Sequence, residues 1–238
     1  MRVVFLLVFL IFSCFGAFGQ QPSYGAATVS LMDQADDRSL EVRYDSFFDK
    51  LYYAVAEGEE GEFLPSQVSE FTTGGARYYS IPMAGGQPAF FKVLYEGASY
   101  AVLQKDLSAS LIQYLCSEYP ASFWAEADEQ SGRLRLYYRS GNSLIADMAE
   151  ELELESATFV ATPSGLCLFQ LHTPGTLTSD ELDAAKAAEP GLQMISLKKL
   201  FSSQQQFAQA KKIIRGNKLQ LDSPTTIADA FRQIEAQL

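Results

Sequence analysis

The residues that could do chemistry are few in this 238-residue chain, which holds a single histidine, His172. A serine triad needs a histidine as its general base, and no serine here stands in a G-x-S-x-G turn. Zinc sites usually need several histidine or cysteine ligands. Phosphate-binding loops need a lysine directly after a loop glycine. The sequence therefore predicts no catalytic residue, no metal site and no cofactor, and His172 is expected at a strand end or on the surface.

Carboxylates offer a second chemistry. Glu151 and Glu153 form one pair, and Glu126, Asp128 and Glu129 form a separate cluster. Two carboxyl groups that flank a glycosidic bond can hydrolyse it, one as the acid and the other as base or nucleophile. Acidic clusters are also typical of solvated surfaces. A carboxylate-based hydrolase is therefore an alternative and not the leading interpretation.

Cys116 and Cys167 are the two cysteines beyond the N-terminal leader described below, and each stands beside leucine. In an oxidising compartment such a pair can form a disulfide, which would join the middle of the chain to its later part. Apolar neighbours are also consistent with two buried free thiols. The sequence leaves both alternatives open.

Charge is distributed unevenly along the chain, whose formal net charge is −11. Between Leu197 and Leu221 every charged residue is basic: Lys198, Lys199, Lys211, Lys212, Arg215 and Lys218. The preceding stretch, 147–189, is mainly acidic. The basic segment either lies near an acidic segment of the same fold or binds an anionic partner, such as a phospholipid headgroup or an acidic glycan. The overall charge argues against general nucleic-acid binding, which needs a basic face.

Aromatic side chains gather at Tyr119, Phe123 and Trp124, close in sequence to Tyr114. If exposed, this cluster would be a platform for sugar rings or for the apolar patch of a partner. If buried, it would anchor the core or its rim. The cluster and the basic segment are the two candidate contact surfaces.

The first nineteen residues have the pattern of a secretory signal peptide. Arg2 supplies positive charge, Val3–Phe12 is an apolar run, and Ala17–Gly19 offers small residues for cleavage before Gln20. The run is shorter than the ~20 residues that cross a bilayer core, so no transmembrane span is expected after cleavage. We expect a periplasmic or extracellular protein. Because Cys14 stands where a lipoprotein box would place it, a lipid anchor at Cys14 is the alternative.

The rest of the chain divides by composition into three parts. Residues 20–38 carry Pro, Gly, Ser and acidic residues with little periodicity, and are expected to be a flexible lead-in. Residues 39–148 hold short alternating apolar runs rich in tyrosine, which predict an antiparallel β-rich domain. Residues 149–238 are expected to form a mixed segment that ends in amphipathic helices. The predicted fold class is α+β, with hairpins or a meander followed by C-terminal helices.

The clearest predicted hairpin joins Ala89–Tyr95 to Ser99–Leu103, with Gly97 supplying the positive backbone torsion of a tight turn. A second hairpin is expected around Gly141. The other predicted strands cover 40–44, 50–55, 77–81, 133–138, 143–146, 158–161 and 166–171. The predicted helices cover 107–119, 179–189 and 195–216, with a last one that begins near Pro224.

Part of this pattern resembles a domain of exported, mostly uncharacterised proteins of the Bacteroidota. The matching residues are Phe63–Val68, Phe71, Gly75, Tyr78–Tyr79, Phe90–Gly97 and Tyr137–Tyr138 with Gly141. The resemblance covers about residues 40–145, and its motifs are turn glycines and core aromatics. It implies a β-rich fold and a place in the cell envelope, often ahead of an outer-membrane barrel, and it implies no active site.

Together these patterns favour an exported, non-catalytic envelope or periplasmic protein that acts through protein or surface contacts. The expected partner is another envelope protein or an anionic surface. A glycan- or lipid-binding module is the first alternative, and the carboxylate-based hydrolase is the second.

Overall fold

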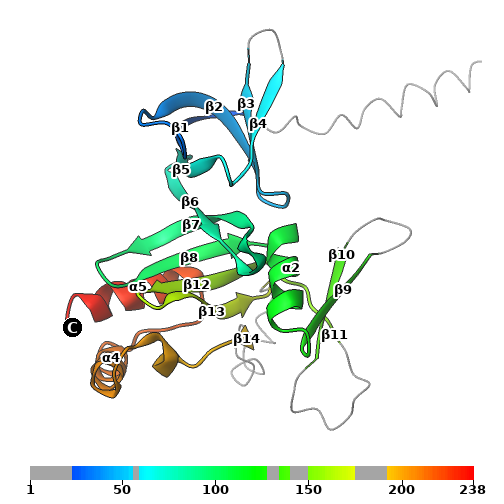
Figure 1. Cartoon of the computed structure of the whole chain (residues 1–238). Helices are drawn as coiled ribbons and strands as arrows, with labels where there is room; N and C mark the ends of the chain where they lie inside the picture. The colour runs from blue at the N-terminus through cyan, green and yellow to red at the C-terminus, as the bar shows by residue number, and fades with distance from the viewer. Residues whose placement is uncertain (1–22, 56–58, 128–133, 140–149, 175–191) are drawn as a thin grey trace, which may run out of the picture.

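The computed structural model of the chain describes residues 23–55, 59–127, 134–139, 150–174 and 192–238 (Figure 1). Over these residues the fold is α+β and mostly antiparallel sheet, with two of its helices at the C-terminal end, which confirms the expected fold class. None of the described helices is long and apolar enough to cross a bilayer. The predicted signal peptide (1–19), Cys14, the strand at 143–146 and the helix at 179–189 lie outside the described residues.

Among the described residues, eleven strands form one antiparallel sheet in the order β14-β13-β12-β8-β7-β6-β5-β1-β2-β3-β4. In chain order they are β1 (Gly25–Leu31), β2 (Arg38–Asp45), β3 (Lys50–Ala54), β4 (Glu60–Phe63), β5 (Val68–Thr73), β6 (Ala76–Pro82), β7 (Pro88–Glu96), β8 (Ala101–Asp106), β12 (Ser156–Thr162), β13 (Gly165–His172) and β14 (Leu192–Gln193). A second sheet has the order β11-β10-β9. Its strands are β9 (Phe123–Ala127), β10 (Leu134–Tyr138) and β11 (Glu150–Glu151).

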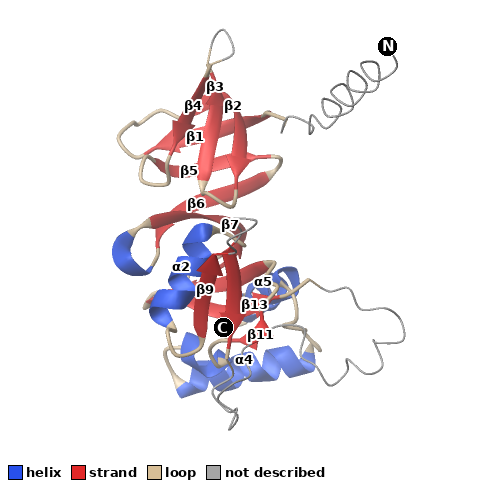
Figure 2. Ribbon diagram, turned by 90° about the vertical axis from the view of Figure 1, so that its right-hand side faces the viewer, coloured by secondary structure: helices blue, strands red, loops and turns tan. Residues whose placement is uncertain are grey.

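Helices cover both faces of the lower half of the large sheet (Figure 2). The described helices are η3 (Ala84–Gly86), α2 (Ala109–Glu118), η5 (Leu197–Leu200), α4 (Gln204–Gly216) and α5 (Pro224–Glu235), of which η3 and η5 are 3-10 helices. Because neighbouring residues of a strand point to opposite faces, Leu103 joins a core under α2 and the small sheet, whereas Val102 joins a core under α4 and α5.

The last helix begins and packs as the sequence predicts. The Ser223 side chain accepts from the Thr226 backbone N–H, Thr226 bonds back to the Ser223 backbone, and Pro224 occupies the first turn. The apolar residues recur every three or four positions and are buried against β7 and β8: Ile227, Ala228, Phe231 and Ile234.

The prediction of a flexible lead-in over residues 20–38 is wrong in the middle of that segment. Residues 25–31 form β1, which pairs with β2 on one side and β5 on the other. Ala27 and Val29 are buried, whereas Ala26 and Thr28, which alternate with them along the strand, are exposed. This is the period-two alternation of a half-buried strand, carried by small residues that composition alone does not flag.

The predicted boundary at 148/149 does not divide the fold, because β12 pairs along its length with β8. The division that the structure shows lies earlier. Strands β1 to β5 enclose their own core, and this β1–β5 lobe stands above the helix-covered half of the sheet in Figure 1. Strand β7 serves both halves, since Phe90 joins the core of the β1–β5 lobe and Phe91 joins the core under α2.

Two details of the predicted hairpins differ. Strand β10 pairs with β9 and β11, and β9 was not predicted. Gly97 is not among the residues with positive φ. A Cβ at Gly97 would instead collide with the Glu235 carboxylate and the Tyr95 hydroxyl, so glycine is required there for close approach of α5 to the β7–β8 turn.

A buried ion pair joins the β1–β5 lobe to the rest of the molecule. Asp49, in the β2–β3 turn, accepts hydrogen bonds from the Lys105 ammonium on β8 and, through Oδ2, from the Ser110 hydroxyl on α2. Its Oδ1 also accepts from the Phe90 N–H and the Tyr44 hydroxyl, each at 3.3 Å. The Lys105 and Asp49 side chains are 1% and 7% exposed, and burial lowers the pKa of Lys105 against the opposing pull of Asp49.

We predict that Asp49→Ala lowers the free energy of unfolding by about 3–5 kcal/mol, because it leaves the Lys105 ammonium buried without a counter-ion. Adding Lys105→Met removes that charge, so the double variant should recover part of the loss. Urea titration of each variant measures both values.

The matched control is Glu62→Ala, which breaks the exposed Lys50–Glu62 pair (2.9 Å) and should change stability little. An Asp49→Ala loss no larger than that of the control would show that the buried pair does not hold the two halves together.

Candidate functional site

His172 ends β13 and is buried, so it is a strand-end residue as expected but not a surface one. Its Nε2 lies 2.7 Å from the Oγ1 of the buried Thr158 on the paired strand β12. Burial lowers the pKa of His172 to about 4, against a smaller opposing effect of Asp222. The imidazole is therefore neutral at physiological pH and serves as a hydrogen-bonding partner inside the sheet.

This histidine makes stability depend on pH. Its folded pKa is about 4 and its reference value is 6.5, so between these values the unfolded chain binds a proton that the folded chain does not. Stability is then complete above pH 6.5 and falls by up to about 3 kcal/mol as the pH drops to 4. The His172→Gln variant, which keeps a hydrogen-bonding group, should show a flatter pH profile in urea titrations. An unchanged profile would contradict the assignment.

The carboxylates considered for hydrolysis are exposed wherever the structure describes them. Glu151 and Glu153 are exposed, and Glu151 lies 3.7 Å from the Arg135 guanidinium. Glu126 is exposed on β9, whereas Asp128 and Glu129 lie outside the described residues. Across the part of the chain that the structure describes, no group of three or more His, Cys, Asp or Glu side chains is placed to hold a metal ion.

Cys116 and Cys167 are free thiols in the structure, so the Cys116–Cys167 disulfide is not part of it. Cys116 lies on α2 and packs against the core under that helix, while Cys167 on β13 packs against the core under α4 and α5. Burial raises the pKa of the Cys116 thiol, which makes it less reactive.

The aromatic cluster divides between the core and the surface of the small sheet. Phe123 is 1% exposed and is a core residue. Tyr119 is partly buried and packs against it, at a ring-centroid distance of 6.3 Å. Trp124 points to the other face of β9, where its ring stacks on Tyr137 at 5.7 Å. The Arg139 guanidinium lies 5.2 Å from the centroid of the Trp124 ring.

Stacking by Tyr137 and Arg139 engages the Trp124 ring within the small sheet, which favours the rim-anchor interpretation over the sugar platform. Sequence reasoning missed both partners. The signal was present in the cross-strand register, which places Tyr137 opposite Trp124, but that register follows only from pairing β10 with the unpredicted β9.

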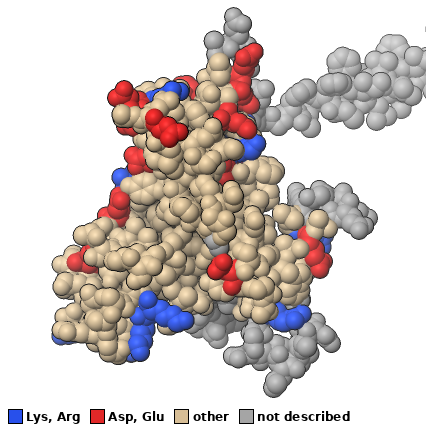
Figure 3. Space-filling model, in the orientation of Figure 1, with Lys and Arg blue, Asp and Glu red and all other residues tan. Residues whose placement is uncertain are grey.

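The basic residues gather at one end of the molecule. We call this surface the basic face; it comprises Lys198 and Lys199 on η5, Lys211, Lys212 and Arg215 on α4, and Lys218 just after it, all exposed. Among the described residues, no carboxylate lies within ion-pair distance of any of the six. Figure 3 shows blue side chains over this end and red ones over the β1–β5 lobe.

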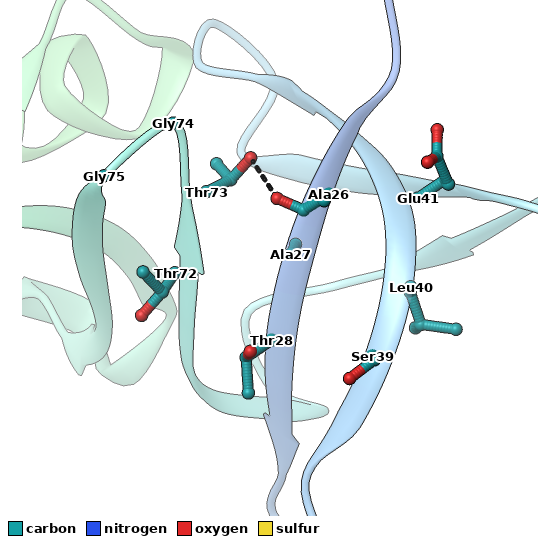
Figure 4. Close-up of a pocket in the computed structure, with 10 residues that line it drawn as sticks. All are labelled: Ala26, Ala27, Thr28, Ser39, Leu40, Glu41, Thr72, Thr73, Gly74 and Gly75. Atoms are coloured by element: carbon teal, nitrogen blue, oxygen red, sulfur yellow. Dashed lines mark hydrogen bonds between the residues drawn. The ribbon is translucent and has the colours of Figure 1, made fainter.

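An open trough of about 470 Å³ crosses β1, β2 and β5 (Figure 4). Its lining is small and polar, with Ala26, Thr28 and Ser39 on the strands and Glu41 as its one charged residue. The Thr73 hydroxyl on β5 donates a hydrogen bond to the Ala26 carbonyl on the neighbouring strand β1, at 3.4 Å. This surface offers no convergent donors or buried reactive group.

A deeper groove of about 440 Å³ lies between the β7–β8 turn, the β12–β13 turn, η5 and the end of α5. Glu235 lies in it and accepts hydrogen bonds from the Ser99 N–H and, at 2.6 Å, from the Tyr95 hydroxyl. Burial and Glu235 together raise the pKa of Tyr95 to about 12, so this hydroxyl remains a donor. Tyr100 and Lys199 also line the groove, which therefore brings together a carboxylate, an ammonium group and a phenol hydroxyl.

No protein-family model, no curated protein and no solved structure matches this chain. The resemblance to the exported Bacteroidota domain therefore stays a prediction.

Proposed function

We propose that this protein is an exported, non-catalytic component of the cell envelope that docks on an anionic phospholipid surface through its basic face. The observation that carries the proposal is the absence, among the described residues, of any carboxylate paired with the six cations of that face. Of the two interpretations of the basic segment, an external anionic partner is the one this supports.

The arrangement of α4 suits a flat charged partner. Lys211 and Arg215 are four residues apart, which places them on one side of the helix, and Lys218 follows just after its end. The apolar side, with Ala210 and Ile214, packs against the core under α4 and α5. Each Lys or Arg near an anionic membrane contributes about 1 kcal/mol, so several together bind well at low salt.

The rest of the charge distribution would orient the protein on such a surface. Acidic residues outnumber basic ones in the β1–β5 lobe, where the basic residues are Arg38, Arg43 and Lys50. A negatively charged membrane repels this lobe and attracts the basic face at the opposite end. Docking would therefore hold the β1–β5 lobe away from the membrane.

Co-sedimentation with vesicles tests the docking. Vesicles with 30% phosphatidylglycerol in phosphatidylcholine should bind the protein at low salt, and pure phosphatidylcholine vesicles should not. The double variant Lys211→Gln/Arg215→Gln should bind roughly 30-fold more weakly, because two cations are lost. The control Arg38→Gln/Lys50→Gln removes the same charge from the β1–β5 lobe and should bind at least as well as the unmodified chain. Equal loss in both variants, or no binding to anionic vesicles, would overturn the proposal.

Export is tested by the mature N-terminus. In protein fractionated from its native cells, mass spectrometry should find Gln20 as the first residue, because Ala17–Gly19 fits the cleavage pattern. An acylated Cys14 would replace the soluble form with a tethered one. Intact Met1 on cytosolic protein would refute export altogether.

A further inference from the structure

Tyr100 lines the groove and has a hydroxyl without a partner. The residue is 6% exposed, and its ring packs against Phe201 and Phe231, with ring centroids 5.7 and 5.5 Å away. No described residue hydrogen-bonds to the Tyr100 hydroxyl. Every fully buried side-chain oxygen of the described chain has a hydrogen-bond partner, so the Tyr100 oxygen is not one of them. The hydroxyl is therefore not fully buried, and Tyr100 is one of the residues that line the groove.

Two opposite charges share this groove. Lys199 on η5 is exposed, and no carboxylate lies within ion-pair distance of it among the described residues. Glu235 on α5 is fixed by the Ser99 N–H and the Tyr95 hydroxyl. These bonds fix the position of the carboxylate, which lines the groove.

We infer that the groove binds a small zwitterionic ligand, with a carboxylate or phosphate accepting from Tyr100 and Lys199 and an ammonium group facing Glu235. The 440 Å³ of the groove suits a ligand of modest size. The Glu235 carboxylate would repel a ligand that carries only negative charge, and the Lys199 ammonium would repel a ligand that carries only positive charge. A ligand that carries both charges satisfies both residues, so the inference goes beyond membrane docking and does not depend on it.

Titration calorimetry with simple probes tests this inference. The ω-amino acids from glycine to 6-aminohexanoate vary the distance between ammonium and carboxylate, and phosphoethanolamine replaces the carboxylate with phosphate. At least one of these zwitterions should bind, and hexanoate and hexylammonium should bind at least tenfold more weakly. Preference between the carboxylate series and phosphoethanolamine identifies the acidic group. Binding of the single-charge probes equal to the zwitterions, or of no probe at all, would refute the inference.

Three variants assign the binding to this groove. Tyr100→Phe removes only the hydroxyl and Lys199→Gln only the charge, so each should weaken the best probe about tenfold. Lys212→Gln, on α4 outside the groove, makes the same charge change and should leave probe binding unaltered. Unchanged affinity in both groove variants would overturn the assignment.

The two proposals fail separately. Tyr100→Phe should bind anionic vesicles like the unmodified chain, whereas Lys211→Gln/Arg215→Gln should bind the probe normally. If the unmodified chain binds a zwitterionic probe but not anionic vesicles, the docking proposal is wrong and the groove inference stands. If it binds anionic vesicles but no zwitterionic probe, the groove inference is wrong and the docking proposal stands.

Discussion

The buried contact between Asp49 and Lys105 is the constraint on which the arrangement of the two halves depends. Taking two ions out of water costs several kcal/mol each unless their remaining bonding capacity is filled. Here the Asp49 carboxylate accepts hydrogen bonds from a lysine, a serine, a tyrosine and a backbone N–H, which come from four separate elements. The acidic lobe and the basic end of the molecule are therefore held at a fixed separation, which the proposed docking on a membrane would require.

The basic face and the groove meet at η5, where Lys199 belongs to both. This short helix lies between β14 and α4, and its Leu200 is buried in the same core as Phe231 of α5. A ligand in the groove and a phospholipid surface would therefore compete for one ammonium group. If both proposals hold, binding of the two partners would be linked through this residue by charge competition, with no conformational change.

Elements with strong periodicity could be predicted from the sequence, and elements made by distant pairing could not. Helix α5 carries its capping serine, its first-turn proline and an apolar stripe, all readable locally. Strand β1 was missed because its buried residues are as small as Ala27. The Asp49–Lys105 pair spans 56 residues, and the groove draws on four segments between Ala98 and Leu238. No local sequence pattern predicts such contacts between distant residues, because they depend on which strands pair.

Strand β7 places adjacent phenylalanines in separate cores, with Phe90 among the strands of the β1–β5 lobe and Phe91 beneath α2. Neither core can lose its share of this strand without disturbing the other. Folding of the two halves should consequently be a single cooperative event, and amide hydrogen exchange in their central strands should proceed through one common opening. A chain organised in this way resists partial unfolding at either end, which limits the exposure of its long sheet to proteases and to other chains.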